Sequence, residues 1–499
     1  MSQIVATFAA DMKRLNRCIS LAWLVAVTMP VGAQRLRVGE PAGSGMRLLT
    51  LDSCRAMALQ NNKQMQISRT KQEVAADVRR SARTKYLPHV NAIGAYEHTS
   101  KEVSLLSDEQ KTALSNLGSA VAPGVQELTG LNASNLAPLM NAKGQDLVDA
   151  VRTDSRNIFA GSVLLTQPIY MGGAIVAANK MADLSEQMTA NQTEQQRQQT
   201  IYDVDQAYWQ VVSLTHKKRL AESYLQLVRQ LESDVSRMVI EGVATRSDLL
   251  SVGVKVNEAE MNVTKVNDGL VLSKMLLCQR IGLPVSDQIT LTDESSQEIV
   301  ATEETALTPN VTLAMNLRPE LRMLLNTVDI SKQSTRLLRA TGLPQIALTG
   351  GYAVSNPNVL NGFEKKFDGF WHIGIVARVP IWNWGDVRYK VRASKGATAI
   401  ASLELEEARE KIELQVSQNA FRVDEAYKRL AMARSDIRHA DENLRTANLG
   451  FKEGVISTTA VMEAQTAWLQ AQSQQIDAEI DVRLSQTDLQ KALGVLSEK

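Results

Sequence analysis

The sequence predicts a mainly α-helical protein with a small β part, built from two similar halves. Three observations support this fold class. Matching residues recur at a constant offset, long stretches show heptad periodicity, and four short alternating runs indicate strands. Aromatic residues make up only 4% of the 499 residues, whereas strong helix formers are abundant, which favours long helices. Each half is expected to read helix, strand, loop, strand, long helix, turn, helix.

The N-terminus has the pattern of a secretory signal peptide. Three basic residues precede an apolar run at 19–29, and Pro30–Ala33 supplies the small residues of a cleavage site. The apolar run is too short for a membrane-spanning helix. We therefore expect the chain to be exported and cleaved after Ala33.

An internal duplication defines the two halves. Residues 168–170 (Pro-Ile-Tyr) match 380–382 (Pro-Ile-Trp) at an offset of 212, and 87–88 (Leu-Pro) match 343–344 at an offset of 256. The difference leaves 44 additional residues in the first copy. Helical solenoids repeat about every 20–50 residues. A period above 200 therefore indicates duplicated half-proteins.

The duplication sets the expected domain boundaries. These are a signal peptide at 1–33, a first repeat at 34–284 with a long loop at 99–158 and a helical hairpin at 172–284, a linker at 285–310, and a second repeat at 311–496 with two strands within 345–379 and a hairpin at 385–496. The linker is rich in Ser, Thr, Asp and Glu, which is typical of a connection, and a short strand is possible at 288–291.

Period-two alternation predicts the strands. The four runs are 89–98, 159–166, 345–354 and 371–379. A tilted strand of about ten residues, at about 3.3 Å per residue, spans an apolar band of roughly 25 Å. An edge strand of a soluble domain is the alternative for each run.

Heptad spacing predicts the hairpins. In the second copy, large apolar residues recur every seven positions from Val416 to Phe451, and alanines follow the middle four by three positions. After the turn at 450–454 the seam resumes from Val461 to Leu489. The long arm would extend roughly 95 Å at about 1.5 Å per residue, so it must belong to a bundle, fibre or tube. The first copy has the same design in a looser form.

Two joints connect strands to hairpins. Pro168 and Pro380 cannot donate a ladder hydrogen bond, so each is expected to end strand pairing. Gly172, Gly173 and Gly385 would then let the chain turn from a strand into a helix. The aromatic residues beside them suit a membrane interface.

These features together resemble the TolC-type outer-membrane efflux family over about residues 46–496. The marks are the duplication, the strand ends at 167–169 and 379–381, the segment Asn316–Leu321, and the hairpin turns at 242–249 and 454–461. The resemblance implies a homotrimer. It also implies a twelve-stranded barrel in the outer membrane of a Gram-negative bacterium, joined to a periplasmic helical tube.

The resemblance implies a passive exit duct, engaged by a periplasmic adaptor and, through it, by an inner-membrane pump. No phosphate-binding glycine loop, His–carboxylate cluster or paired-Cys motif points to catalysis, so we expect no enzyme, no cofactor and no metal. A formal net charge of +1 gives no indication of nucleic-acid binding. The alternative function is a structural coiled-coil protein of the periplasm or cell surface, without a pore.

The resemblance places function at the hairpin turns. Residues expected to bind the adaptor are Gly242, Val243, Ala244, Thr245, Ser247, Leu249, Gly454, Val455, Ile456, Ser457, Thr458 and Thr459. Asp248 and Glu463 fall at acidic gate positions, where a ring of three carboxylates would favour cations. Asp248 also fits a simple helix-capping role. Arg246 is a candidate for the basic partner that the family has where this chain has Ile456.

Two features have open alternatives. The insertion, within about 101–158, belongs to a loop expected to be extracellular, where it caps the pore, contacts a surface partner or only decorates the mouth. Cys54 and Cys278 are expected near the middle of the tube, as a disulfide or as two buried thiols.

Overall fold

The computed structural model describes residues 47–100, 106–129, 135–151, 156–296, 310–358 and 365–496. The predicted signal peptide lies outside these residues, as does part of the predicted linker. None of the helices in the described ranges combines the length and the apolar character needed to cross a membrane.

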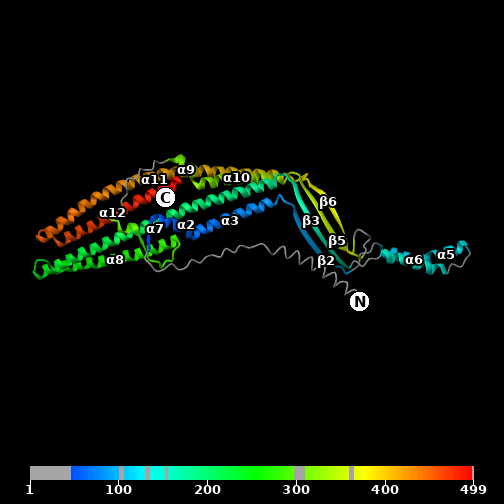
Figure 1. Ribbon diagram of the computed structural model, residues 1–499, viewed down its shortest axis with the longest axis horizontal. Coiled ribbons are helices and arrows are strands. Elements are labelled where there is room, and N and C mark those ends of the chain that lie inside the picture. Colours follow the sequence, from blue (N-terminus) through cyan, green and yellow to red (C-terminus); the bar gives the residue numbers. More distant parts are fainter. Residues whose placement is uncertain are drawn as a thin grey trace. The chain divides into compact units, whose positions relative to one another are not determined.

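The order of elements follows the predicted duplication (Figure 1). The first repeat contains β1 (Arg47–Leu49), α2 (Leu51–Asn61), α3 (Lys63–Thr84), β2 (His89–His98), α4 (Asp108–Ser115), α5 (Leu117–Thr129), α6 (Leu136–Val151), β3 (Asn157–Met171), α7 (Ala174–Ile240) and α8 (Arg246–Ile281). The connection holds β4 (Ile289–Leu291), which pairs in parallel with β1, and the 3-10 helix η2 (Thr292–Ser295). The second repeat contains α9 (Val311–Leu317), α10 (Pro319–Ala340), β5 (Gln345–Asn356), β6 (Asp368–Arg378), α11 (Asp386–Lys452) and α12 (Thr458–Leu493).

The two hairpins have identical dimensions. Helices α7 and α11 each contain 67 residues, and α8 and α12 each contain 36. Their boundaries differ by the offset of 212 that the sequence shows. A left-handed glycine precedes each long helix and follows each short one. The backbone of the hairpin is therefore conserved between the halves while its side chains differ.

The first helix of each repeat is broken, whereas the sequence suggested one continuous helix. Asn62 separates α2 from α3 with an extended backbone, and its side-chain oxygen accepts a hydrogen bond from the Gln64 amide at 2.8 Å. In the second repeat Arg318 is extended because Pro319 follows it and begins α10. Two different local causes thus produce the same break.

The larger sheet is antiparallel, with the order β2-β3-β5-β6. The central pair joins one strand from each repeat, so the sheet links the two halves. Strands β2 and β6 lie at its edges. Trp371, Ile373 and Ile375 alternate along β6 and are all exposed in the single chain.

Strand β3 runs through Pro168, contrary to the expectation that this proline ends strand pairing. Pairing with β2 stops at Thr166, but pairing with β5 continues to Met171 with a register shift between Pro168 and Tyr170. Proline removes one donor, and a bulge accommodates that loss on one side of the strand. In the second repeat, β6 ends at Arg378, before Pro380.

The core follows the predicted heptad seams. Helix α7 packs along α8 and α11 along α12 (Figure 1). Buried seam residues of the second hairpin are Val416, Val423, Leu430, Leu444, Phe451, Val461, Val482 and Leu489, with Ala426, Ala433, Ala447, Ala464, Ala471, Ala478 and Ala492 beside them. Small alanine side chains let the two backbones approach closely, so the hairpins are packed along their length.

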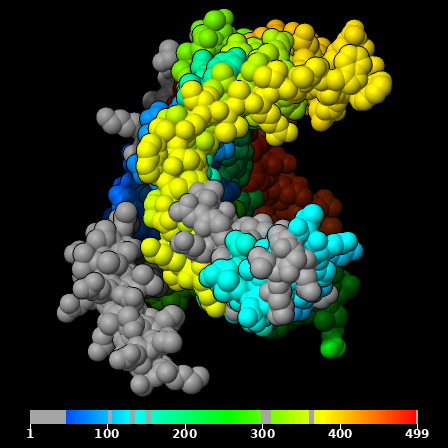
Figure 2. All heavy atoms as spheres, turned by 90° about the vertical axis from the view of Figure 1, so that its right-hand side faces the viewer, coloured from blue at the N-terminus to red at the C-terminus, as the bar shows by residue number. Residues whose placement is uncertain are grey.

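The insertion of the first repeat is a folded unit of three helices, coloured cyan in Figure 2. Helix α6 packs against both α4 and α5. A Cβ atom on Gly144 would lie 1.8 Å from the Leu114 carbonyl oxygen, and one on Gly118 would lie 2.2 Å from that of Ala137. The Asn141 side chain also accepts a hydrogen bond from the Gly118 amide at 2.7 Å. The helices therefore cross at distances that only glycine permits.

Candidate functional site

The two hairpin tips have the same backbone. Each long helix ends two residues before a glycine in the left-handed region, Gly242 with φ +75° and Gly454 with φ +73°. The amides of Val243 and Ala244 donate to the Met238 carbonyl at 2.8 and 3.2 Å. Their counterparts Val455 and Ile456 donate to the Gly450 carbonyl at 2.9 and 3.1 Å. Both turns are thus closed by the same pair of hydrogen bonds.

Side-chain size is exchanged between the tips. The first tip combines Met238 with Ala244, and the second combines Gly450 with Ile456. A Cβ on Gly450 would lie 2.5 Å from Ile456 Cδ1, so that side chain occupies the space over the glycine. This packing explains why an apolar residue stands where the resemblance implies a basic one.

The structure brings the tips together. Buried residues from all four hairpin helices form one apolar cluster near the tips, consisting of Tyr224, Val228, Leu231, Val235, Val252, Val256, Ala259, Leu444, Ala447, Phe451, Val461 and Ala464. Leu249 and Ile456 pack against this cluster. Val243 and Val455 remain strongly exposed at the turns. The two tips therefore form one surface with apolar side chains available on it.

Asp248 caps helix α8. The Thr245 amide donates to Asp248 Oδ2 at 3.0 Å and the Thr245 hydroxyl at 2.6 Å, while the Asp248 amide donates back to Thr245 Oγ1 at 3.2 Å. The Thr245 hydroxyl hydrogen bond holds the pKa of the Asp248 carboxyl below its usual value. Arg246 and Glu463 are exposed. The capping role is observed, and the gate role stays a proposal for all three residues.

The second tip lacks this capping box. Ser457 caps α12 by accepting a hydrogen bond from the Ala460 amide at 3.3 Å. Ala460 has no side-chain acceptor to return the interaction to Ser457. Only the first tip therefore has an acidic residue at this position, where Asp248 matches Ala460 of the second tip.

Each strand-to-helix joint uses left-handed backbone in its own way. Gly172 and Gly173 have φ values of +62° and +86° in the first joint. Trp384 and Gly385 have φ values of +52° and +81° in the second. A Cβ on Gly172 would lie 2.7 Å from the Ala340 carbonyl oxygen, so glycine is required there. Trp384 is largely exposed, and it contacts Trp382 edge to face with ring centroids 5.6 Å apart.

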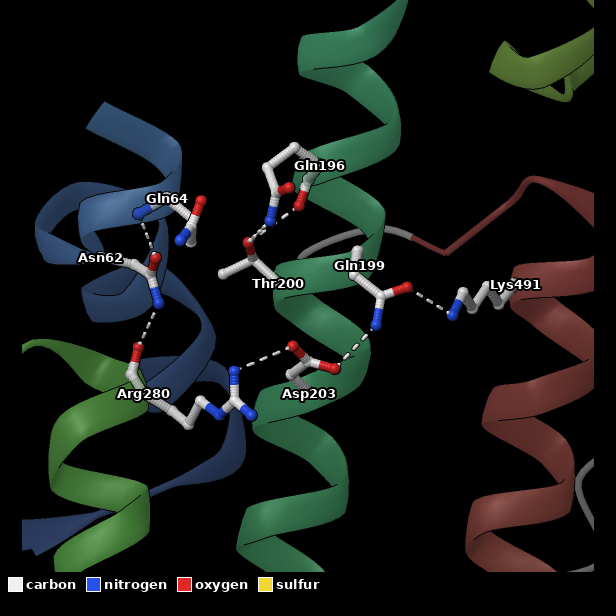
Figure 3. Close-up of polar contacts among 8 residues, drawn as sticks. All are labelled: Asn62, Gln64, Gln196, Gln199, Thr200, Asp203, Arg280 and Lys491. Carbon is white, nitrogen blue, oxygen red and sulfur yellow. Dashed lines mark hydrogen bonds and ion pairs between the residues drawn. The ribbon is translucent and has the colours of Figure 1, made fainter. Parts of the chain in front are cut away.

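A polar network surrounds the middle of α7 (Figure 3). From α8, Arg280 reaches Asp203 at 3.2 Å, and from α12, Lys491 donates to Gln199 at 2.7 Å. The side-chain amide of Asn62 donates to the Arg280 backbone carbonyl at 2.9 Å, which fastens the break between α2 and α3 to α8. The sequence patterns did not identify these contacts, because each joins residues from different elements.

A buried ion pair lies near the two cysteines. Arg55 binds Asp205 through two hydrogen bonds of 2.8 and 2.7 Å, and the Asp205 side chain has no exposed surface. Cys54 and Cys278 belong to the same buried cluster and are free thiols. Burial raises the pKa of Cys54 to about 12, which makes its thiol a poor nucleophile. In the described part of the chain, no group of three or more His, Cys, Asp and Glu side chains could hold a metal ion.

Comparisons with known proteins agree with this geometry. The family model described as "Outer membrane efflux protein" matches residues 55–277 and 310–495. The outer membrane protein TolC of Vibrio cholerae serotype O1 is 25% identical over 174 residues, which are 34% of this chain and 40% of that protein. The alignment thus spans less than half of the curated relative.

Solved structures share the fold over almost the whole chain. The outer-membrane channel CmeC of Campylobacter jejuni has a TM-score of 0.71 at 14% identity, covering 89% of this chain and 85% of that one. The outer-membrane protein VceC of Vibrio cholerae has a TM-score of 0.69 at 13% identity, covering 89% and 96%. At these identities the likeness shows a common fold.

Proposed function

The chain belongs to the outer membrane efflux protein family, and from that premise we propose that it is the passive exit duct of a tripartite export system. Its relatives are outer-membrane proteins of Gram-negative bacteria, and the chain is an outer-membrane protein as they are. The proposed working unit is a homotrimer. A periplasmic adaptor engages it, and an inner-membrane pump supplies the energy through that adaptor.

The observation that carries the proposal is the joining of one sheet to two hairpins of equal length. Strands β2 and β6 lie at the edges of the four-stranded sheet and carry exposed apolar side chains such as Ile93 and Ile373. An edge strand in lipid must find partners for its backbone groups. Neighbouring copies supply them when three chains close one sheet of twelve strands, and the hairpins then surround a common axis.

The tips are the proposed docking surface for the adaptor. Val243 and Val455 offer exposed apolar contacts on two turns with the same backbone. Asp248 and Glu463 of three copies would place carboxylates around the narrow end of the duct, where they favour cations over anions. The capping box does not remove the charge of Asp248, since its lowered pKa keeps the carboxyl ionised at neutral pH.

Conductance in planar bilayers tests the duct. We expect purified wild-type protein to be mostly closed without its adaptor, and the Asp248→Ala/Glu463→Ala variant to conduct several-fold more, with weaker cation selectivity. Ser457→Ala, a change at the second tip that removes no charge, is the matched control and should conduct as wild type does. A protein that is extracted without detergent as an elongated soluble oligomer and never conducts would instead support the structural coiled-coil function.

A further inference from the structure

A polar recess of about 390 Å³ lies on helix α7 between α3 and α10. Its lining includes Ser68 and Lys71 of α3, and Thr189, Gln192, Thr193 and Gln196 of α7. Met323 of α10 supplies an apolar contact, and none of the described residues that line the recess carries a carboxylate. Small-molecule sites in proteins usually occupy about 300–1,000 Å³. The recess is therefore large enough for a small ligand, and most of its side chains are polar.

The second repeat fills the equivalent place with apolar side chains. At the offsets of 256 and 212, the counterparts of Ser68 and Thr193 are Leu324 and Leu405. Leu405 is 7% exposed, and Leu324 packs against the same cluster. Burial of apolar surface is favourable by about 25 cal/mol per Å², so the first repeat forgoes stability here that its twin retains. A polar seam where the same backbone accommodates leucines indicates a site for a ligand.

Several groups in the recess can only accept hydrogen bonds from a ligand. The Thr193 hydroxyl donates to backbone carbonyls of α3 and α7 at 3.3 and 3.0 Å, so its oxygen lone pairs remain. The Thr189 hydroxyl donates to a backbone carbonyl of α7 at 2.9 Å in the same way. The Gln196 side-chain nitrogen donates to Thr200 Oγ1 at 3.3 Å, and its oxygen is available (Figure 3). A ligand that fits must therefore supply donors.

Other groups in the recess can donate. Among the described residues, the side chains of Ser68, Lys71 and Gln192 form no hydrogen bond or ion pair with the protein. The hydroxyl and the amide both donate and accept, whereas the exposed Lys71 ammonium only donates. A carboxylate or phosphate would face the acceptor oxygens of Thr189 and Thr193, and a ligand ammonium would face Lys71. A hydroxyl group, which donates and accepts, fits the whole mixture.

We propose that the polar recess binds a neutral, hydroxyl-rich molecule, such as a unit of an oligosaccharide, on its way through the duct. The proposal rests on the proposed export function and names a substrate class for it. The Gln192 amide can donate to one hydroxyl of a sugar ring and accept from the next. Met323 offers an apolar surface to the carbon–hydrogen face of the ring.

The opposite face of α7 is covered by the chain itself. At about 3.6 residues per turn, Ile201 and Asp205 lie on the side of α7 away from Gln192. Ile201 is fully buried in a cluster with Leu59 of α2, and Asp205 binds Arg55 of the same helix at 2.7 Å. In the proposed duct this additional layer lies outside the ring of helices, because the inside has to stay open for passage. The recess then faces the axis.

Saturation-transfer NMR with maltotriose and cellotriose tests the site in the purified protein, kept in a detergent without a sugar headgroup. We expect transfer to at least one of the two trisaccharides. Ser68→Leu with Thr193→Leu copies the second repeat and should weaken that binding by about tenfold or more, since two hydrogen-bonding groups are lost. No transfer to either trisaccharide, or equal binding by the double variant, would overturn the site.

A smaller change keeps the test independent of folding. Thr193→Val preserves the shape of the side chain, removes one acceptor and should weaken binding several-fold. Thr215→Val is the matched control, because the Thr215 hydroxyl also donates to a backbone carbonyl of α7, at 2.9 Å, but lies outside the recess. It should bind as wild type does, with helical circular dichroism confirming that both variants fold. Equal effects of the two valines would overturn the assignment to the recess.

Competition between monosaccharides of matched size tests the ligand class. Glucose should displace the trisaccharide better than glucuronate, which adds a carboxylate, or glucosamine, which adds an ammonium group. A stronger effect of glucuronate or of glucosamine would overturn the neutral class.

Bilayer recordings separate failure of the site from failure of the duct. In the conducting Asp248→Ala/Glu463→Ala variant, the bound trisaccharide should lower the current, and adding Ser68→Leu with Thr193→Leu should remove that effect. Conduction that the trisaccharides leave unchanged would overturn the place of the recess in the passage and leave the duct standing. Trisaccharide binding by a protein that never conducts would overturn the duct and leave the binding site.

Discussion

Helices α7 and α11 have the same length and the same caps, yet different side chains hold them in place. In the first repeat, Asp205 of α7 is fully buried and binds Arg55 of α2. In the second repeat the matching positions are Ser417 and Val311. The comparison teaches that the backbone of the repeat tolerates quite different interiors, provided that each polar group has a partner.

The largest difference should come from the buried ion pair of the first repeat. Asp205→Ala leaves the Arg55 guanidinium buried without its main partner, and we expect a loss of about 3–5 kcal/mol in the free energy of unfolding. Ser417→Ala, at the matching position, should stay within about 0.5 kcal/mol of wild type. Denaturant titrations followed by helical circular dichroism measure both. Equal losses would show that the two interiors do not differ in this respect.

The second-largest difference in stability between the two repeats should come from substitutions at the strand-to-helix joints. Gly172→Val forces a β-branched side chain into left-handed backbone and against the Ala340 carbonyl, which should cost about 2–4 kcal/mol. Trp384→Gly, at the matching position, should instead relieve strain of about 1 kcal/mol, since Trp384 has a positive φ. The temperature at which the oligomer dissociates on semi-native gels reports both changes. A Gly172→Val protein as heat-resistant as wild type would contradict the crowding at this joint.

The smallest difference in stability should come from substitutions of the residues that cap α8 and α12 at the two tips. Thr245→Ala removes the two hydrogen bonds of the Thr245 hydroxyl, one from the Asp248 amide and one to its carboxylate, and should cost about 1–2 kcal/mol. Ser457→Ala removes one hydrogen bond and should cost about 1 kcal/mol or less. Ala460→Asp should strengthen the second tip by completing a box there. Hydrogen exchange at the first turns of α8 and α12 measures these local stabilities.

The cap of the first tip also has a defined pH dependence. The pKa of Asp248 is lowered in the folded chain by the Thr245 hydrogen bond, so its contribution is present above the ordinary carboxyl pKa of about 4 and is lost as the pH falls through the lowered value. Protection of α8 should therefore decline in acid more than protection of α12. Thr245→Ala should reduce that difference, since only the backbone amide of residue 245 would still donate to Asp248. An undiminished difference would point to another titrating group.

Much of the fold was predictable because it is periodic. The heptad seam from Val416 to Phe451 and the strand at 89–98 agree with the structure, since both patterns depend only on spacing along the chain. The bulge at Pro168 was not predictable, because it depends on β5 continuing past the end of β2. The break at Asn62 has a local cap, but the contact that fastens it to α8 was not predictable, because the Arg280 carbonyl lies 218 residues away in sequence.

The candidate site likewise has features that the sequence predicted and features that only the structure revealed. Glycines at the turns and the residues around them were identifiable from the repeat itself, and the capping alternative for Asp248 is the geometry that the structure shows. The exchange of bulk between Met238 and Gly450 became meaningful only once Ile456 was seen over the glycine. A single sequence records both residues but does not show that they are compensating.

The sequence by itself determined the duplication, the lengths of the hairpins and the family to which the chain belongs. Repeats, heptads and turn glycines are defined by residue types and their spacing along the chain, so they can be recognised without knowing which residues are neighbours in space. Only the tertiary structure decided which faces the chain covers. Trp209 and Phe421 occupy equivalent positions in equivalent helices, yet one is buried by α12 and the other is exposed. Burial depends on neighbours distant in sequence, and the chain places such a neighbour over Trp209 but not over Phe421.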